Sequence, residues 1–440
     1  MSGGPMTDAA QADATQAETA ATDTWAPVPA GSGFGPANLP YGVATLPTGR
    51  TTVVARIGDA VLPVADALPE PQRHLVEAPT LNPFLAAGPA VWRDTRARLR
   101  DHLADRAVER PLVPVADVEL LLPMAVGDYV DFYSSIHHAT NLGRIFRPNG
   151  DALLPNWRHL PVGYHGRSAT ICVSGTPITR PTGLVATGAA GTGDGVRRQP
   201  SAALDLELEV GFVVGPGNEP GRPIAPDDAA EHVFGVVLVN DWSARDLQAF
   251  EYQPLGPFLG KSFATTVSPW VVPLDALAPH LVPPPAQDPV PDPLLRAERP
   301  WGLDLDLEVA LNGTTITHTN LADLYWTFAQ QLAHLTSNGA TTRPGDLFAS
   351  GTVSGPEPGS RGSLIEATWR GRDPLRLDDG GERTWLLDGD TVTISGRGGG
   401  RDGTPLLDLG DATGTILPAR AEALGPATAT AAAATAGAAR

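Results

Sequence analysis

Cysteine, basic residues and long apolar runs are all scarce in this 440-residue sequence. Its one cysteine, Cys172, excludes an intramolecular disulfide framework and a cysteine-rich zinc site, and it is compatible with a reducing cytoplasm. No apolar run reaches the roughly 18 residues that a membrane-spanning helix needs. Met1–Thr24 has neither the basic start nor the apolar core of a signal peptide. We therefore expect a soluble, cytoplasmic protein.

Positive charge is also in short supply. The sequence has 31 Lys and Arg residues against 49 Asp and Glu residues, a formal net charge of −18. This balance disfavours nucleic acid and anionic membranes as partners. It does not exclude a small anionic substrate, because local groups can override the overall field. Gly and Pro are abundant instead, with 48 and 44 residues, which favours a turn-rich, mostly β fold over a helical bundle.

The chain is long enough for two or three domains. Both ends lack periodic hydrophobicity, so we expect disordered tails at residues 1–27 and 421–440, the second of them rich in Ala and Thr. Residues 28–118 are expected to form a small β-barrel with an appended helix. Residues 119–420 are expected to form a larger, mixed and mostly antiparallel β domain.

In the smaller unit, Thr51–Pro63 predicts two short strands that turn at Gly58-Asp59. Asn82-Pro83 predicts the start of a helix that continues to about Leu103. The solvent face of this helix is expected to carry four arginines, namely Arg93, Arg96, Arg98 and Arg100.

The larger unit consists of short strands separated by Gly and Pro turns. The clearest of them are Thr170–Val173, Leu204–Val214, Val233–Val239, Leu303–Leu311 and Thr391–Ser395. Two helices are also predicted, over Ser243–Phe250 and Leu321–Leu335.

Acidic and apolar residues alternate in Leu204–Val210 (LDLELEV). Residues two apart on a strand share a face, so Asp205, Glu207 and Glu209 are expected to point one way. Such a face is usually solvated, and Leu303–Val309 (LDLDLEV) repeats the pattern almost letter for letter. Crowded carboxylates nevertheless repel unless a cation compensates, and hard cations bind such oxygen clusters. The pattern alone therefore does not choose between a metal site and a solvated face.

Gly127–Pro148 (GDYVDFYSSIHHATNLGRIFRP) gathers acids, tyrosines, two histidines and two arginines, with little apolar periodicity. A lone histidine is usually structural or exposed. An Asp, a Tyr, a His and an Arg within about twenty residues could instead supply a metal ligand, a substrate contact, a general base and an anion clamp.

Val236–Thr266 begins as an apolar strand that runs into Asn240-Asp241, where a ligand group can project from the strand end. Ser243 is expected to cap the short helix that follows. Three polar residues have the spacing of one helix face, namely Arg245, Gln248 and Tyr252. Each of them alone is more often an ordinary surface residue.

Two turn-rich loops could also approach a ligand. Lys261 lies between Gly260 and Ser262 after a Pro/Gly-rich stretch. Arg343–Glu366 contains Ser350-Gly351-Thr352, which offers backbone N–H groups and a hydroxyl. The simpler interpretation of either segment is a surface loop.

Taken together and in this order, these segments resemble the fumarylacetoacetase family. The resemblance runs from about residue 38 to residue 418 and is carried by long ungapped runs, which are more specific than any short motif. They are NLPYGV at 38–43, TLNPF at 80–84, LPNWRHLPVGYHGR at 154–167, NDWSARDLQ at 240–248, EYQPLGPFLGKSF at 251–263 and LLDGD at 386–390. The insert at 185–196 and both tails match nothing in the family.

The resemblance implies a mostly β fold, with a small N-terminal SH3-like β-barrel and a larger mixed β-roll of the fumarylacetoacetase type as the catalytic domain. It also implies a homodimer. It assigns a Ca²⁺ site to Asp131, Glu207, Glu209 and Asp241, and an Mg²⁺ site to the neighbourhood of Asp241, Lys261 and Thr265. In the repeated strand, by contrast, Asp304, Asp306 and Glu308 are expected to face solvent.

The resemblance likewise implies the catalytic groups. The base is the histidine directly before Ala-Thr-Asn, which is His138, and its orienting carboxylate is Glu366. Position 137 is a second histidine, so only the motif match favours His138. Stabilisation of the oxyanion that develops during the reaction is assigned to Arg245, Gln248 and Lys261. Substrate contacts are assigned to Tyr133, Arg147, Tyr164, Gln248, Tyr252 and Thr352.

The implied reaction is hydrolysis of the carbon–carbon bond of 4-fumarylacetoacetate to fumarate and acetoacetate, the last step of tyrosine and phenylalanine degradation. A 1,3-diketone is a bidentate oxygen ligand, which suits a hard cation. The alternatives are another enzyme of the superfamily, such as an acylpyruvate hydrolase or an oxo-acid decarboxylase or tautomerase, and a metal-stabilised binding protein without catalysis. The combination of His138 with Glu366 favours the hydrolase.

Overall fold

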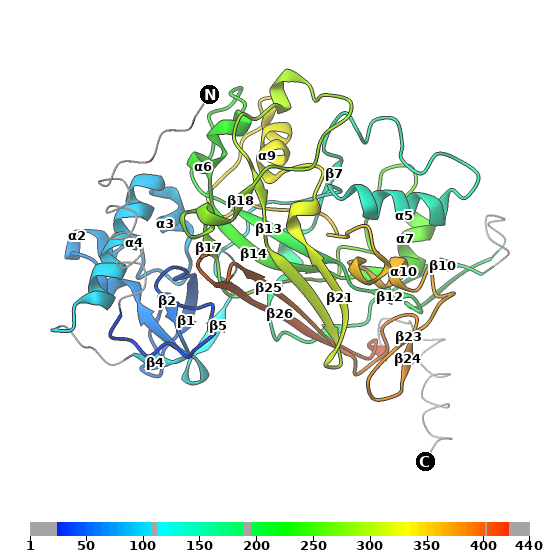
Figure 1. The fold of residues 1–440 in the computed structure, drawn as a ribbon. Coiled ribbons are helices and arrows are strands. Elements are labelled where there is room, and N and C mark those ends of the chain that lie inside the picture. The colour runs from blue at the N-terminus through cyan, green and yellow to red at the C-terminus, as the bar shows by residue number, and fades with distance from the viewer. Residues whose placement is uncertain (1–23, 108–111, 188–194, 401–402, 422–440) are drawn as a thin grey trace, which may run out of the picture.

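The computed structural model describes residues 24–107, 112–187, 195–400 and 403–421 and confirms a mostly β fold (Figure 1). Most of both predicted tails lies outside these residues. Residues 24–27, which the N-terminal tail was predicted to include, pack on the first unit instead: the Trp25 indole N–H donates to His102 O at 2.9 Å, and Ala26 is buried. None of the helices in the described segments is long and apolar enough to cross a membrane.

The N-terminal unit contains a five-stranded antiparallel sheet in the order β4-β3-β2-β1-β5. Its strands are β1 (Tyr41–Thr45), β2 (Thr51–Ile57), β3 (Ala60–Pro63), β4 (Val113–Pro114) and β5 (Glu119–Leu121). The predicted hairpin is confirmed: β2 and β3 pair across a turn at Gly58, whose φ of 53° suits glycine. Because β5 pairs with β1, this sheet continues to Leu121, slightly past the predicted end of the unit at residue 118.

The helix predicted from Asn82 to Leu103 is two helices, α3 (Asn82–Ala86) and α4 (Pro89–Ala104). Gly88 separates them with a φ of 82°, and Pro89 then occupies the first turn of α4, where its missing N–H costs nothing. The prediction of Arg96 on the solvent face was wrong. Its side chain is buried and its guanidinium donates to Asn38 O at 2.6 Å, so it ties α4 to the loop before β1.

The larger unit is built on an eight-stranded sheet in the order β7-β6-β22-β13-β14-β16-β8, with β17 paired to β14. Its strands are β6 (Tyr129–Phe132), β7 (Gly163–His165), β8 (Ile171–Val173), β13 (Leu208–Val214), β14 (Val233–Asp241), β16 (Thr265–Val267), β17 (Val272–Pro273) and β22 (Leu347–Ala349). The single strand predicted over Leu204–Val214 is interrupted, because β12 (Leu204–Asp205) pairs with β15 (Ser243–Ala244) instead.

A second sheet has five strands in the order β21-β20-β25-β26-β9 and packs over the first (Figure 1). Its strands are β9 (Ile178–Thr179), β20 (Asp306–Leu311), β21 (Thr314–Asn320), β25 (Thr391–Gly398) and β26 (Leu407–Leu417). Side chains from both sheets form one apolar core, in which Leu208 and Val210 of β13 meet Leu307 and Val309 of β20. The strand predicted at Leu303–Leu311 divides into β19 (Gly302–Leu303) and β20.

The opposite face of the eight-stranded sheet is covered by the N-terminal unit over part of its length. Val213, Val237 and Val239 from that face belong to the same apolar cluster as Val53 and Phe84 of the N-terminal unit. Side chains on both faces of β13 are therefore buried, which a half-solvated strand would not show.

The larger unit also has small strand pairs and helices that lie outside the two main sheets. The small strand pairs are β10 (Thr182–Ala186) with β11 (Val196–Pro200), β18 (Leu281–Val282) with β19, and β23 (Leu375–Arg376) with β24 (Glu382–Arg383). The helices are α5 (Ile136–Phe146), α6 (Ala229–His232), α7 (Arg245–Glu251), α8 (Leu274–Leu277), α9 (Phe328–Thr336) and α10 (Leu364–Ala367), with α2 (Glu70–Arg73) in the N-terminal unit. The centre of the unmatched insert lies outside the described residues, between β10 and β11.

Two helix predictions need correction. Leu321–Leu335 is not one helix: a short 3₁₀ turn is followed by α9, which begins where Thr327 and Gln330 form a capping box. The predicted cap of α7 was also wrong. Ala244 is its N-cap, and the hydroxyl of Ser243 donates to Asp241 O at 3.1 Å.

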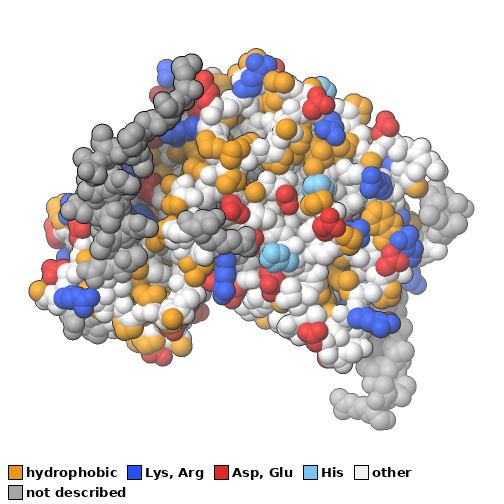
Figure 2. Space-filling model, in the orientation of Figure 1, with side chains coloured by type: hydrophobic (Ala, Val, Ile, Leu, Met, Phe, Trp, Pro, Cys, Tyr) orange, Lys and Arg blue, Asp and Glu red, His pale blue; other side chains and the backbone are white. Residues whose placement is uncertain are grey.

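Acidic and basic side chains are interspersed with apolar ones on the face of the molecule seen in Figure 2. No large patch of one charge forms on this face. Acidic residues on this face are thus dispersed, and several others are buried in the site described next.

Candidate active site

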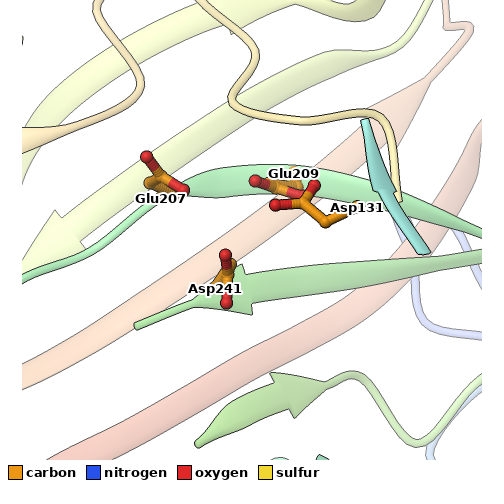
Figure 3. Close-up of side chains that lie close together, drawn as sticks. All are labelled: Asp131, Glu207, Glu209 and Asp241. Carbon is orange, nitrogen blue, oxygen red and sulfur yellow. The ribbon is translucent and has the colours of Figure 1, made fainter. Parts of the chain in front are cut away.

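Four buried carboxylates converge at one end of the eight-stranded sheet (Figure 3). Asp131 comes from β6, Glu209 from β13 and Asp241 from the end of β14, while Glu207 immediately precedes β13. A ligand oxygen from each of the four lies within 4.8 Å of the others. The register explains the meeting, because Ala349 on β22 pairs with both Asp131 and Gly211, so β6 and β13 flank β22 at this level.

Several oxygens of this cluster lack hydrogen-bond partners. Both carboxylate oxygens of Glu209 and Oδ1 of Asp131 are buried and unpartnered. Burial, together with the neighbouring negative charges, raises the pKa of Glu209 and of Asp131 well above ordinary values. Unpaired buried oxygens are costly, so the cluster has the donor set and the electrostatic demand of a site for a hard cation.

Two basic side chains compensate part of the negative charge. The Lys261 ammonium donates to Glu207 and, at 2.5 Å, to Oδ2 of Asp241. Arg245 donates to Oε1 of Glu207 at 2.7 Å. Burial alone would raise the pKa of Glu207, but the charges of Lys261 and Arg245 outweigh it and lower that pKa. Glu207 and Asp241 are therefore the two paired carboxylates of the four, whereas neither carboxylate oxygen of Glu209 has a hydrogen-bond partner.

The residues fit the two implied ions unequally. Asp131, Glu207, Glu209 and Asp241 present carboxylate oxygens, which suit Ca²⁺ or another hard divalent ion. At the site implied for Mg²⁺, Asp241 accepts a hydrogen bond from the Thr265 hydroxyl at 3.3 Å. Burial lowers the pKa of Lys261, but Asp241 and Glu207 outweigh that effect and raise it, so the side chain stays an ammonium without a lone pair. Any ligand from Lys261 would have to be its backbone carbonyl oxygen.

His138 and Glu366 lie together beside the cluster. Nδ1 of His138 is 2.5 Å from Oε2 of Glu366, and both side chains are buried. Three more groups donate to the Glu366 carboxylate: Ser363 Oγ at 2.7 Å, Ser354 Oγ at 2.9 Å and Asn141 Nδ2 at 3.0 Å. Burial raises the pKa of Glu366, but His138 and these hydrogen bonds outweigh it and hold that pKa below its ordinary value. The Glu366 charge is thus retained next to the imidazole.

His138 lies on α5, a helix that was not predicted. Ser135 caps it by accepting from His138 N at 3.2 Å, and its buried side consists of His138, Ala139, Leu142 and Gly143. The helical signal was present in the sequence and was overlooked, because Ile136, Ala139, Leu142 and Gly143 recur at the spacing of one helix face. Gly143 is needed, because a Cβ there would lie 1.7 Å from Ala152 O.

His137 lies next to His138 in sequence but outside this network. Its side chain is half-buried, and it lowers the pKa of Asp323, which burial raises. The two side chains point in different directions because neighbouring residues on α5 are about 100° apart around the helix axis.

The groups predicted around the oxyanion are also together. Arg245 and Gln248 lie one turn apart on α7, and Arg245 Nη1 donates to Gln248 Oε1 at 3.0 Å. Gly260, expected to allow a ligand to approach, is instead required by this helix, because a Cβ there would lie 2.8 Å from Gln248 N.

A pocket of about 430 Å³ is lined by most of these groups: three of the four carboxylates (Asp131, Glu207 and Glu209), His138, Arg245, Gln248 and Lys261. Its wall includes every residue predicted to touch a substrate, namely Tyr133, Arg147, Tyr164, Gln248, Tyr252 and Thr352. Tyr164 donates to Asp241 Oδ2 at 3.1 Å, and the hydroxyl of Thr352 is buried without a partner. Gly351, beside Thr352, has a φ of 74° and lies so close to β6 that a Cβ would meet Phe132 O at 2.1 Å.

The sequence predictions missed several members of this network. Asp205 pairs with Arg245 at 2.7 Å, and Asn141, Ser354 and Ser363 all bind Glu366. Asp205 shares the alternation of Glu207 and could have been included with it. Asn141 is three residues after His138, so recognition of α5 would have placed the two on one helix face.

Two family models match the chain. The model of the fumarylacetoacetase N-terminal domain matches residues 37–123, and that of the fumarylacetoacetate hydrolase C-terminal domain matches residues 129–415. The fumarylacetoacetase of Homo sapiens is 49% identical over 361 residues, which cover 78% of this chain and 84% of the human one. That of Bos taurus is 45% identical over 424 residues, which cover 90% of this chain and 99% of the bovine one.

A solved structure supports the fold. The fumarylacetoacetate hydrolase of the psychrophile Exiguobacterium antarcticum superimposes with a TM-score of 0.52 at 19% sequence identity. The match covers 87% of this chain and 100% of that one. At this identity the likeness concerns the fold alone.

Proposed function

The chain belongs to the fumarylacetoacetase family, and we propose that it hydrolyses the carbon–carbon bond of 4-fumarylacetoacetate to give fumarate and acetoacetate. One observation carries the proposal: three of the four clustered carboxylates, namely Asp131, Glu207 and Glu209, line the same pocket as His138, which is paired with Glu366. Metal-supported hydrolysis needs both.

The carboxylates of Asp131, Glu207, Glu209 and Asp241 would hold a divalent ion. When bound, such an ion supplies Lewis-acid polarisation of the two oxygens of a 1,3-diketone. We propose Ca²⁺ for this cluster and Mg²⁺ near Asp241 and Thr265.

His138 is the general base in this proposal. A carboxylate beside Nδ1 favours the tautomer that carries its proton there, which leaves Nε2 free to accept one. Nε2 lies 3.8 Å from Oε1 of Glu207, at the edge of the carboxylate cluster. His138 would take a proton from a water molecule, and Glu366 would stabilise the imidazolium that forms.

The attacked carbonyl is the one next to the fumaryl alkene. Water oxygen bonds to its carbon, and the oxyanion that forms would be bound by Arg245, Gln248 and Lys261. Cleavage of the carbon–carbon bond then releases fumarate and leaves its electron pair on the acetoacetate enolate. The imidazolium of His138 can return its proton to that enolate, which completes the balance of one water consumed.

The remaining wall of the pocket would select the substrate. Arg147 lies exposed at the pocket wall, where it could pair with a terminal carboxylate of the diketo acid. Tyr133, Tyr164, Tyr252 and the Thr352 hydroxyl offer further hydrogen bonds. The ring of Tyr133 also packs edge-on against His138, with centroids 5.3 Å apart.

We further propose that the working form is a homodimer in the cytoplasm. The dimer is supported by the family resemblance. The location is supported by the single cysteine, Cys172, which is compatible with a reducing compartment.

The direct test is to incubate purified protein with fumarylacetoacetate and to identify the products. We expect fumarate and acetoacetate in equal amounts. Decarboxylated or tautomerised product alone would favour the other enzymes of the superfamily, and absence of any reaction with metal-loaded protein would refute the proposal.

The two histidines allow a matched test of the base. His138→Ala is expected to lower kcat by at least about 10²-fold with little change in KM, because a general base acts in the transition state. His137→Ala should lower kcat far less, and Glu366→Gln should fall between them. A larger loss at His137 than at His138 would show that the base is assigned to the wrong residue.

A further inference from the structure

Asp205, to which the resemblance assigns no role, contacts both Arg245 and the segment that carries Glu366. Its carboxylate is fully buried and accepts four hydrogen bonds. Oδ2 accepts from Arg245 Nε at 2.7 Å and from Ile365 N at 3.1 Å. Oδ1 accepts from Leu364 N at 2.7 Å and from Leu206 N at 2.8 Å. All four partners are N–H donors, so each carboxylate oxygen accepts two hydrogen bonds.

These contacts reach two different sets of reacting groups. Leu364 and Ile365 begin α10, and the next residue is Glu366, which holds His138. On the other side, the remaining nitrogens of Arg245 contact Glu207 and Gln248. Asp205 is therefore the one described side chain that hydrogen-bonds both to Arg245 and to the segment bearing Glu366.

Building on the function proposed above, we propose that Asp205 is a positioning residue that fixes the general-base pair relative to the oxyanion groups. The buried carboxylate holds the first turn of α10 and the Arg245 guanidinium at one separation. Water attack requires His138 and Arg245 to act on the same carbonyl at the same time, so this separation decides how well the two work together.

An amide at this position cannot make the same contacts. Asparagine has one acceptor oxygen, and its NH₂ group would face N–H donors of Arg245 or of α10. A buried donor would then be left unsatisfied, and the guanidinium would lose one of its two anionic partners. Either α10 or Arg245 must shift.

The test compares Asp205→Asn with Asp304→Asn, the equivalent position of the repeated LDLDLEV strand. Asp304 is exposed, accepts from Asn320 Nδ2 at 2.7 Å and is not among the residues that line the pocket. We expect Asp205→Asn to lower kcat about 10–100-fold, the usual range for partners of site residues, while KM changes little. Asp304→Asn should leave kcat and KM unchanged.

Two readouts separate positioning from loss of stability. In a double-mutant cycle, Asp205→Asn and Glu366→Gln should together cost less than the product of their separate losses, since both disturb one unit. The low-field ¹H NMR signal of the His138 Nδ1 proton, identified by its loss in His138→Ala, should move or broaden in Asp205→Asn. This signal is observed without substrate, so it tests the role of Asp205 even where the proposed reaction fails.

Unchanged kcat in a folded Asp205→Asn protein would overturn the proposal. The proposal would also be overturned if the loss of kcat in the double variant equalled the product of the two separate losses and the His138 Nδ1 proton signal were unchanged in Asp205→Asn. If Asp205→Asn does not fold, Asp205→Glu decides: it keeps the charge but displaces α10 or Arg245. The proposal then requires a reduced kcat and a shifted signal, and wild-type values of both would refute it.

Discussion

Two strands of this protein have nearly the same sequence and opposite roles. LDLELEV at 204–210 and LDLDLEV at 303–309 differ at one position, where Glu207 corresponds to Asp306. Their aliphatic residues behave alike, since both sets enter the same apolar core from the two facing sheets. Their acidic residues do not. Asp205, Glu207 and Glu209 are buried, whereas Asp304 is exposed and Asp306 and Glu308 are half-exposed.

The difference comes from what covers each sheet. The polar face of β13 lies on the side of the eight-stranded sheet that the N-terminal unit and the pocket loops cover. The polar face of β20 lies on the outside of the five-stranded sheet, where Glu308 accepts from Thr315 at 2.9 Å. An alternating pattern therefore predicts a strand and an apolar face reliably, but the fate of its carboxylates depends on residues far away in sequence.

The largest expected difference between the two strands is catalytic. Glu209→Gln removes a carboxylate from the cluster and should lower turnover of fumarylacetoacetate by at least about 10²-fold, since even partners of metal ligands cost about 10–100-fold. It should also lower the bound metal measured by elemental analysis. Glu308→Gln, its counterpart on β20, should change neither. Equal effects of the two substitutions would remove the distinction between the strands.

A second comparison concerns the aliphatic faces, where the strands should agree. Leu206→Ala and Leu305→Ala each empty a buried site in the shared core. Each is expected to destabilise the fold by about 2–5 kcal/mol, visible as similar decreases in the thermal unfolding midpoint at one scan rate. A large decrease for one and none for the other would show that the two strands do not share this core equally.

The smallest expected effect is on the pH dependence of stability. Burial raises the pKa of Glu209 and Asp131, so after chelation these acids destabilise the folded state when ionised. At pH values above the raised pKa values, these two acids make their largest unfavourable contribution to the free energy of folding. This contribution decreases as pH falls toward the ordinary carboxylate range near about 4. Glu207 and Glu366 have lowered pKa values, so their favourable contribution is lost only below that range.

Chelated protein should therefore become more stable as pH falls from neutral to about 5.5, well above the range in which ordinary carboxylates titrate. Thermal unfolding in the presence of a chelator would measure this. Glu209→Gln should flatten the dependence, whereas Glu308→Gln should leave it as in the wild type. A midpoint that falls steadily with pH in chelated wild-type protein would contradict the electrostatic account of the cluster.

Local sequence signals predicted much of the fold. The β2–β3 hairpin follows from Gly58-Asp59 between alternating strands, and β14 follows from an unbroken apolar run. The failures have two causes. Arg96 was placed in solvent because its backbone acceptors come from a loop near residue 38. α5 was missed for a different reason, since its polar residues drew attention away from the helical spacing of Ala139, Leu142 and Gly143.

The assembly of the site was predicted by resemblance and not by pattern. The geometry brings together Asp131, Glu207, Glu209 and Asp241 from three segments, and the spacing within any one of them does not indicate that meeting. Asp205 is a residue that fits a sequence pattern although the pattern does not reveal its role. It matched the alternation but belonged to no recognised set, and its importance depends on α10, which follows it by about 160 residues.

The central claim is that the buried carboxylates beside His138 make turnover depend on a divalent ion. The most direct measurement is a titration of exhaustively chelated wild-type protein with Ca²⁺ or Mg²⁺ while the disappearance of fumarylacetoacetate and the bound metal are followed together. We expect no turnover at the start and a rise that parallels bound metal and saturates with it. Full turnover by protein that carries no detectable metal would contradict the account.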